Sequence, residues 1–263
     1  MLTIAIASLS GGQGKTTASL MLGRLLSRQG YPTLLIDADP QHNLTTYLDV
    51  ELQTNQPTLL EFLKKSVSAE NSIYPSEGND NLFLIPADDQ LDTVQDYLSN
   101  SGVGATLLKR RLEPIADAFK VCIIDAPPQR SQICLTVLGA ADSLIIPAEA
   151  SVKGYGSLVR TLDLLRTLQD MGATDAQVMG VLPFRDRWIG NTQTHESRAA
   201  VDGMRDEVGE ALILPSIRES ERYKQAINRR STLSDMGYPE LEYPFEVLIN
   251  KISKLAKKKK TKN

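Results

Sequence analysis

The feature that most constrains the fold is a cluster of glycines where an apolar run meets a helical pattern. Residues 2–9, LTIAIASL, form a continuous apolar run, which is typical of a parallel strand buried on both faces. Residues 10–17, SGGQGKTT, follow it, and leucines then recur near helical spacing until Gly30 ends the pattern. A strand, a glycine-rich turn and a helix in this order predict a phosphate-binding loop, because glycines let backbone N–H groups wrap an anion.

The residues of this loop are those that phosphate binding needs. We expect the following residues at the nucleotide: Gly11, Gly12, Gln13, Gly14, Lys15, Thr16 and Thr17. Lys15 supplies a positive charge to the β- and γ-phosphates, and Thr16 supplies a hydroxyl for Mg²⁺. The strict pattern G-x-x-x-x-G-K-[ST] requires glycine at position 9, where this chain has Leu9. The alternative, a glycine turn with a chance GKT, leaves the surrounding strand and helix unexplained.

Further short apolar runs predict a sheet. They read TLLIDADP, LFLIPA, VCIIDAPP, SLIIPAEA and QVMGVLPF, with helical patterns such as SLVRTLDLLRTLQDMG between them. This alternation predicts an α/β fold with a doubly wound, mostly parallel sheet and helices on both faces. Ligands of such sheets bind beyond the carboxyl ends of the strands. We therefore expect residues 11–17, 37–41, 125–128 and 149–154 to share one site.

The length and composition suit one large domain. The 263 residues, 41% hydrophobic and 23% charged, predict a single domain over residues 1–256 and a basic, mobile tail over residues 257–263. The net charge of −3 means that any nucleic-acid binding must come from a local patch. Cys122 and Cys134 lie in or beside apolar runs, which indicates buried thiols in a reducing compartment. No apolar run reaches the roughly 18 residues of a membrane span, so we expect a cytoplasmic protein.

Three aspartates at strand ends are candidates for metal and water chemistry. Asp125 ends VCIIDAPP, as a Walker B motif requires, and is expected to hold Mg²⁺ through its water shell. In LLIDADPQHN, Asp39 is expected to orient the attacking water, and Asp37 to belong to the metal shell. The alternative for each is a structural role as the cap of the turn or helix that follows.

The segments GGQGKTT, DADPQHN and DAPP, in this order and spacing, resemble the ParA/MinD family of deviant Walker-A ATPases. The resemblance covers most of the chain. It implies a P-loop NTPase fold, ATP and Mg²⁺ as cofactors, and a homodimer that sandwiches two ATP molecules. It also implies slow hydrolysis stimulated by a partner protein, and nonspecific binding of the dimer to DNA or a membrane. Carried over by motif position, Lys15 contacts phosphate, Thr16 and Asp125 serve Mg²⁺, and Asp39 supports hydrolysis.

The chain departs from this family at Ser10, where relatives carry a signature lysine that reaches the other subunit's phosphates. Two triphosphates that face each other repel unless another cation compensates. Lys153, in PAEASVKGYG, follows another strand end, and we hypothesise that it is the catalytic replacement. Arg130 is a second candidate, and an ordinary solvated lysine is the alternative. Loss of the signature lysine resembles the carboxysome-distributing branch, which implies carboxysomes as cargo, a cargo adaptor and nucleoid DNA as partners.

The C-terminal stretch YPFEVLINKISKLAKKKKTKN bears on the choice between DNA and a membrane. Its apolar residues fall on one helical face: Phe245, Leu248, Ile249, Ile252 and Leu255. Such a helix anchors the MinD branch to membranes, but here the lysines follow the apolar face instead of flanking it, so we favour docking on the core. Lys257 and Lys258 are then candidates for DNA phosphates. The segment IRESE resembles a DNA-contacting segment of partition ATPases and adds Arg218, with a solvated charged face as the alternative.

Other functions share these motifs. A plasmid or chromosome partition ATPase would use the same chemistry with DNA as its cargo, and a MinD-like division-site regulator would bind a membrane. An electron donor of the nitrogenase iron-protein type needs cysteines that bridge a cluster, and the spacing of Cys122 and Cys134 gives no specific support for one. Pro215, Arg185 and Asp186 lie in segments where family members build the base pocket, without an individual assignment.

Overall fold

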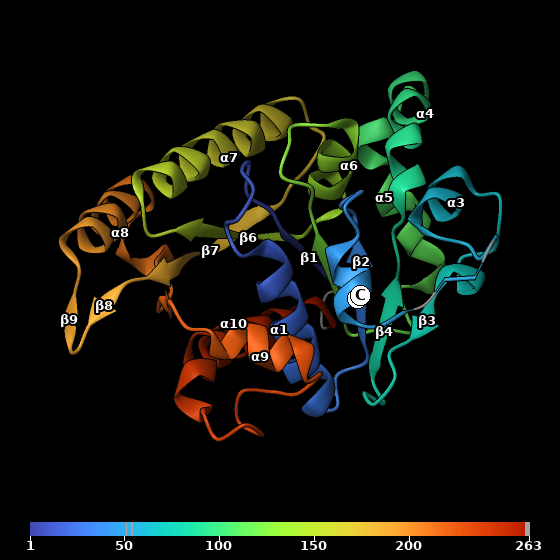
Figure 1. Ribbon diagram of the computed structural model, residues 1–263. Coiled ribbons are helices and arrows are strands. Elements are labelled where there is room, and N and C mark those ends of the chain that lie inside the picture. Colours follow the sequence, from blue (N-terminus) through green and yellow to red (C-terminus); the bar gives the residue numbers. More distant parts are fainter. Residues whose placement is uncertain (51, 54, 261–263) are drawn as a thin grey trace.

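A mostly parallel sheet lies at the centre of the chain, as the computed structural model shows for residues 1–50, 52–53 and 55–260 (Figure 1). The strands are Leu2–Ile6 (β1), Thr33–Asp37 (β2), Tyr74–Pro75 (β3), Leu82–Ile85 (β4), Val121–Asp125 (β5), Ser143–Glu149 (β6), Gln177–Asp186 (β7), Trp188–Ile189 (β8), Thr192–Gln193 (β9) and Ile217–Arg218 (β10). The helices are Lys15–Arg28 (α1), Asn43–Tyr47 (α2), Leu59–Lys64 (α3), Val94–Asn100 (α4), Gly104–Leu112 (α5), Gln132–Ala140 (α6), Val152–Asp170 (α7), His195–Val208 (α8), Arg222–Asn228 (α9) and Tyr243–Lys260 (α10).

The strand order confirms the predicted doubly wound sheet. The order is β10-β7-β6-β1-β5-β2-β4-β3, and β8 and β9 form a separate antiparallel hairpin. The neighbours pair in parallel, except that β3 is antiparallel to β4. Strand β1 lies between β5 and β6, so the chain winds outward from it in both directions. This is the switch point at which ligands of such sheets bind.

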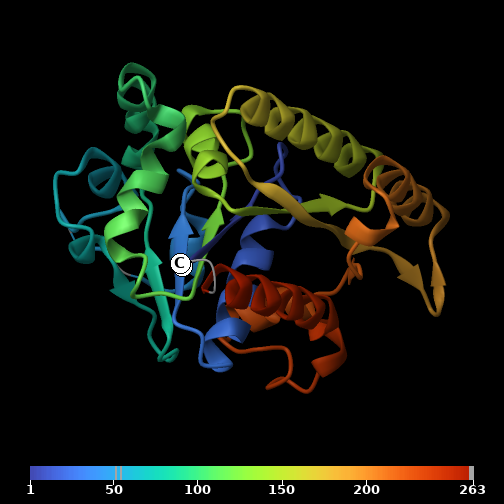
Figure 2. The same ribbon diagram turned by 180° about the vertical axis from the view of Figure 1, so that it is seen from behind.

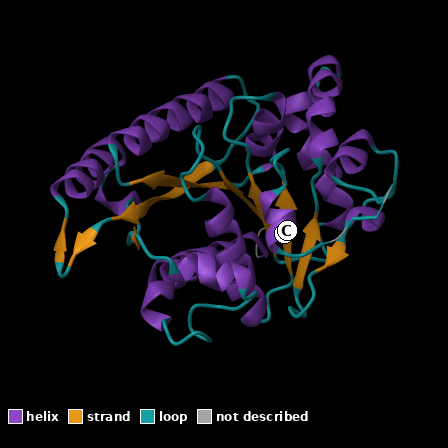
Figure 3. Cartoon of the chain, in the orientation of Figure 1, coloured by secondary structure: helices purple, strands orange, loops and turns teal. Residues whose placement is uncertain are grey.

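Helices cover both faces of the sheet because its strands are apolar on both (Figures 1 and 3). In β1, Leu2, Ile4 and Ile6 join one buried cluster, whereas Ala5 joins the other. Helices α3 to α7 pack on the Ala5 face, and α1, α9 and α10 pack on the opposite face, as the view from behind also shows (Figure 2). The result is a three-layer arrangement in which helices cover the two faces of the sheet but not the ends of its strands.

Helix α10 docks on the core, as we expected from its separated apolar face. Phe245, Leu248, Ile249 and Ile252 are buried in the cluster that also contains the inner face of α1. The helix continues through residues 257–260, so the predicted tail begins inside it, and residues 261–263 lie outside the described residues. The ammonium of Lys259 lies 2.5 Å from a carboxylate oxygen of Asp142. Among the described residues, no helix is both long and apolar enough to cross a membrane.

Candidate functional site

The loop between β1 and α1 has the shape of an anion cradle. Gly12 and Gly14 have φ angles of 80° and 90°, in the left-handed region that favours glycine. A Cβ atom at Gly11 or Gly12 would meet nothing within 4 Å, whereas one at Gly14 would lie 2.6 Å from the ring of Phe184. Open space therefore faces the first two glycines, and α1 begins directly after the loop, at Lys15. Such a loop can take phosphate oxygens on its backbone N–H groups.

A cavity of about 330 Å³ lies over this loop. It brings together residues 11–17, Asp39, Gln41, Asn43, Tyr47, Pro128, Phe184 and Arg185. The predicted loop and Asp39 therefore do share one site. Tyr47 and Phe184 were not predicted, because they reach the site only through the packing of α2 and β7. Arg185 has a φ of 51°, which is uncommon outside glycine and typical of a residue constrained at a functional site.

Lys15 lines this cavity, and buried Asp125 lies close to Lys15 and Thr16. The Lys15 ammonium donates to the Ser10 carbonyl at 3.0 Å, and burial lowers its pKa although Asp125 and Asp39 oppose this. Burial, and secondarily the Asp37 charge, raises the pKa of Asp125 to about 8. The hydroxyls of Thr16 and Ser19 donate to the Asp125 carboxylate, the latter at 3.2 Å. A divalent cation would favour the ionised form of Asp125 and offset its burial, so the donor set fits Mg²⁺.

Asp37 and Asp39 differ in what their carboxylates contact. One oxygen of Asp37 accepts from the backbone N–H and the hydroxyl of Thr45, both at 2.8 Å, and the other accepts from the Asp39 N–H at 3.2 Å. Burial raises the pKa of Asp37 to about 6 despite these bonds. Asp39 accepts from the Gln41 N–H at 3.1 Å and lines the cavity. Both oxygens of Asp37 are thus occupied by contacts within the following turn and helix, which was the alternative to its expected place in the metal shell. Asp39 instead lines the cavity, where it was expected to orient water.

Lys153 lies beside the phosphate loop. Its ammonium donates to the Gly11 carbonyl at 3.2 Å and remains exposed. The loop is also tied to the end of β6, because the side chain of buried Gln13 accepts from the Glu149 N–H at 2.8 Å. Arg130 is exposed in the segment after β5. The structure therefore places the Lys153 ammonium beside Gly11, the residue after Ser10. Position 10 is where relatives carry the signature lysine that this chain lacks.

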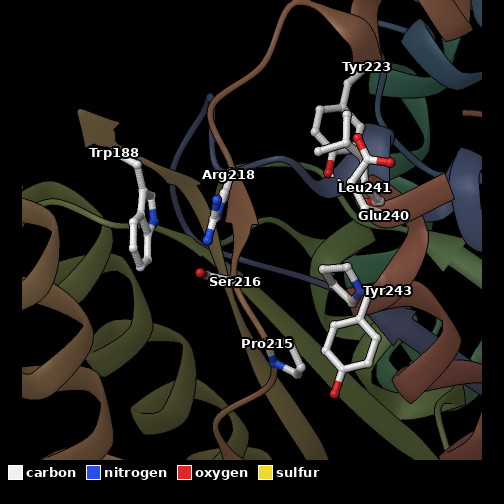
Figure 4. A pocket seen from close by; sticks show the side chains of 9 residues that line it. Trp188, Pro215, Ser216, Arg218, Tyr223, Glu240, Leu241 and Tyr243 are labelled. Atoms are coloured by element: carbon white, nitrogen blue, oxygen red, sulfur yellow. Dashed lines mark hydrogen bonds between the residues drawn. The ribbon is translucent and has the colours of Figure 1, made fainter. Parts of the chain in front are cut away.

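The residues predicted to contact DNA lie apart. Arg218 ends β10, and its guanidinium carbon stacks 4.1 Å from the ring centroid of Trp188 (Figure 4). Both residues line a second cavity of about 370 Å³, together with Pro215, Ser216, Tyr223, Glu240, Leu241, Tyr243 and Pro244. Buried Asp186 supports this wall by accepting from Trp188, Gln193 and Ser216. Lys258 instead lines a cavity at the amino ends of β1, β6 and β7, whereas Arg218 lies at the carboxyl end of β10.

Comparisons with known proteins find relatives that match almost the whole chain. An AAA domain family matches residues 1–172. Maintenance of carboxysome distribution protein A of Synechococcus elongatus is 53% identical over 252 residues, which cover 96% of this chain and 99% of that protein. A variant of Cyanothece McdA in complex with ATP superposes with a TM-score of 0.94, at 50% identity and 96% coverage of both chains.

A more distant enzyme shares the fold. The cobyrinic acid a,c-diamide synthase of Mycobacterium smegmatis with bound ADP and magnesium has a TM-score of 0.76, at 25% identity, covering 88% of this chain and 91% of that one. The near full-length similarity at about half identity is decisive for the family. The chain belongs to the family of maintenance of carboxysome distribution protein A, within the ParA/MinD-like AAA-domain proteins.

Proposed function

We propose that the protein is a slow, partner-stimulated ATPase that dimerises with ATP, binds nucleoid DNA nonspecifically in the cytoplasm, and positions carboxysomes through an adaptor. The observation that carries the proposal is that Lys15, Thr16 and Asp39 line one glycine-rich cavity, and that buried Asp125 accepts a hydrogen bond from Thr16. The similarity to proteins of carboxysome distribution supports the choice of cargo.

In this proposal, each residue of the site has a separate role in ATP hydrolysis. The loop N–H groups and Lys15 bind the phosphates, and Thr16 and Asp125 hold Mg²⁺, which when bound neutralises charge on the phosphate oxygens. Asp39 orients the attacking water, and burial raises its pKa while Lys15 acts in the opposite direction. Asp37 holds the turn that carries Asp39, through the bonds to Thr45 and to the Asp39 N–H.

Dimerisation depends in this proposal on Lys153. Its ammonium contacts the residue after Ser10, so it can supply a cation to a facing triphosphate where the serine cannot. Val152 beside it is 81% exposed, which suits contact with a second copy.

The test is Lys153→Ala against Arg166→Ala, because Arg166 is an exposed cation on the same helix, α7. We expect Lys153→Ala to lose ATP-dependent dimerisation in light scattering while it still binds ATP, and Arg166→Ala to dimerise like the parent. Dimerisation and hydrolysis of Lys153→Ala at the parent's level would refute this role.

DNA binding is expected to be electrostatic and dependent on the dimer. Arg218 and the pair Lys257 and Lys258 would contribute separate weak contacts that the dimer doubles. Affinity for random duplexes should then fall steeply with salt, require ATP, and weaken in Arg218→Ala and in Lys257→Ala/Lys258→Ala. The exposed pair Lys64 and Lys65 on the other side of the sheet provides a matched control. Sequence-specific or nucleotide-independent binding would contradict this model.

The cargo distinguishes this function from plasmid or chromosome partition. A pulldown from cell extract with and without ATP should recover a protein bound to carboxysomes. Recovery of a centromere-binding protein instead would assign the chain to partition, with the ATP chemistry unchanged.

A further inference from the structure

Buried hydroxyls tie the start of the phosphate loop to helix α7. The hydroxyls of Ser8 and Ser157 lie 2.9 Å apart, and the Leu9 N–H donates to the Thr161 hydroxyl at 3.0 Å. The Thr161 hydroxyl in turn donates to the Ser157 carbonyl at 2.7 Å. Ser8, Ser157 and Thr161 are all fully buried. Ser157 and Thr161 are one helical turn apart, so a single face of α7 presents both groups to the loop.

These bonds fix the part of the loop that contacts Lys15. The Ser10 N–H donates to the Ser8 carbonyl at 2.8 Å, which closes a tight turn around Leu9, the residue that is bonded to Thr161. The carbonyl of Ser10 then accepts from the Lys15 ammonium. The path from Thr161 to Lys15 therefore runs through Leu9 and Ser10, with a hydrogen bond at each end.

Apolar side chains would be the ordinary occupants of these positions. Both Ser157 and Thr161 lie on the side of α7 that carries Leu158, Leu162 and Leu165 into the core. Burial of hydroxyls is unfavourable unless their hydrogen bonds are made. Here the Ser8 hydroxyl pairs with that of Ser157, and the Leu9 N–H and the Ser157 carbonyl pair with that of Thr161.

We propose that Thr161 and Ser157 are positioning residues that preorganise the phosphate loop for ATP without touching the nucleotide. The proposal rests on the proposed function as an ATP-binding protein. Loss of the Thr161 hydroxyl leaves the Leu9 N–H without its partner, so the loop shifts and the Ser10 carbonyl and Lys15 leave their places. The expected cost is roughly a tenfold loss of ATP affinity, the range for a buried donor left unpaired.

The experiment compares Thr161→Val with Thr167→Val. The Thr167 hydroxyl also donates to the carbonyl four residues earlier, at 2.8 Å, but Thr167 is exposed and contacts no part of the loop. The dissociation constant of a fluorescent ATP analogue is measured well below the melting temperature of every variant. We expect roughly tenfold weaker binding for Thr161→Val, unchanged binding for Thr167→Val, and recovery in Thr161→Ser, which keeps the hydroxyl.

A purely structural role would lower the melting temperature of Thr161→Val without changing its ATP affinity, and that result overturns the proposal. If Thr161→Val does not fold, Ser157→Ala replaces it, and parental affinity in that variant has the same meaning. Failure of the parent chain to bind the analogue would overturn both this inference and the proposed function. Parental binding with no effect of either substitution would overturn this inference alone.

Discussion

Substitution of the three loop glycines by alanine should change the free energy of unfolding to different extents, because their φ angles and the space around them differ. Gly11 has neither a left-handed φ nor a neighbour within 4 Å of an added Cβ; Gly12 has only the left-handed φ; Gly14 has both the φ and the Phe184 ring at 2.6 Å. A left-handed backbone costs a non-glycine residue about 1–2 kcal/mol, offset by about 0.4–1 kcal/mol because alanine restricts the unfolded chain. Displacing Phe184 from its packed site adds about 1–3 kcal/mol.

The free energy of unfolding without nucleotide should therefore rise by about 0.4–1 kcal/mol in Gly11→Ala, fall by about 1 kcal/mol in Gly12→Ala, and fall by about 2–4 kcal/mol in Gly14→Ala. Urea denaturation followed by circular dichroism measures all three. Gly11→Ala should nevertheless bind ATP poorly, because its methyl group enters the cavity where phosphate is expected. Equal stability of Gly14→Ala and Gly12→Ala would refute the packing argument for Phe184.

Three further predictions concern carboxylates and thiols. Asp39→Asn should bind ATP at near-parental affinity but hydrolyse it about 10²–10⁴-fold more slowly in a phosphate-release assay; unchanged turnover would exclude its role. Burial raises the pKa of Asp37 from 3.8 to about 6, so the folded chain binds a proton that the unfolded chain releases. Without Mg²⁺, the Asp37 contribution to the free energy of unfolding should thus increase by up to about 3 kcal/mol as pH falls from 7.5 towards 4, and the raised pKa of Asp125 acts in the same direction. A decrease measured by urea denaturation would contradict this. Cys122 and Cys134 are buried, with the pKa of Cys134 raised to about 12, so thiol reagents should label them only on unfolding; rapid labelling of the native chain would contradict their burial.

Much of the fold could be predicted because its signals are local. Each apolar run ended by a polar or proline residue became a strand, and the glycine loop lies at the switch point of the sheet. The docking of α10 followed from an apolar face that precedes its lysines. The hairpin of β8 and β9 was missed, although Gly190 and Asn191 between two short runs are a recognised turn signal.

The site could be predicted only where its residues belong to one motif. Lys15 and Thr16 follow the glycine loop after β1, and Asp39 follows the end of β2, so sequence order alone placed them at the carboxyl ends of the strands. Phe184 and Thr161 could not be found in this way, since each contacts the loop from a distant segment. The role of Asp37 depends on a hydrogen bond to Thr45, eight residues away, whose geometry only the folded turn defines.

The serine at position 10 and the lysine at position 153 depend on each other. Lys15 and Lys153 donate to the carbonyls of neighbouring residues, Ser10 and Gly11, so two ammonium groups already lie against this short stretch. A third ammonium at position 10 would add about 1–3 kcal/mol of repulsion at partly screened protein distances. Ser10→Lys alone should consequently impair ATP-dependent dimerisation, whereas Ser10→Lys combined with Lys153→Ala should restore it by returning the number of cations to two. If the effects of Ser10→Lys and Lys153→Ala on dimerisation are additive in this double-mutant cycle, Lys153 does not take the place of a charge at position 10.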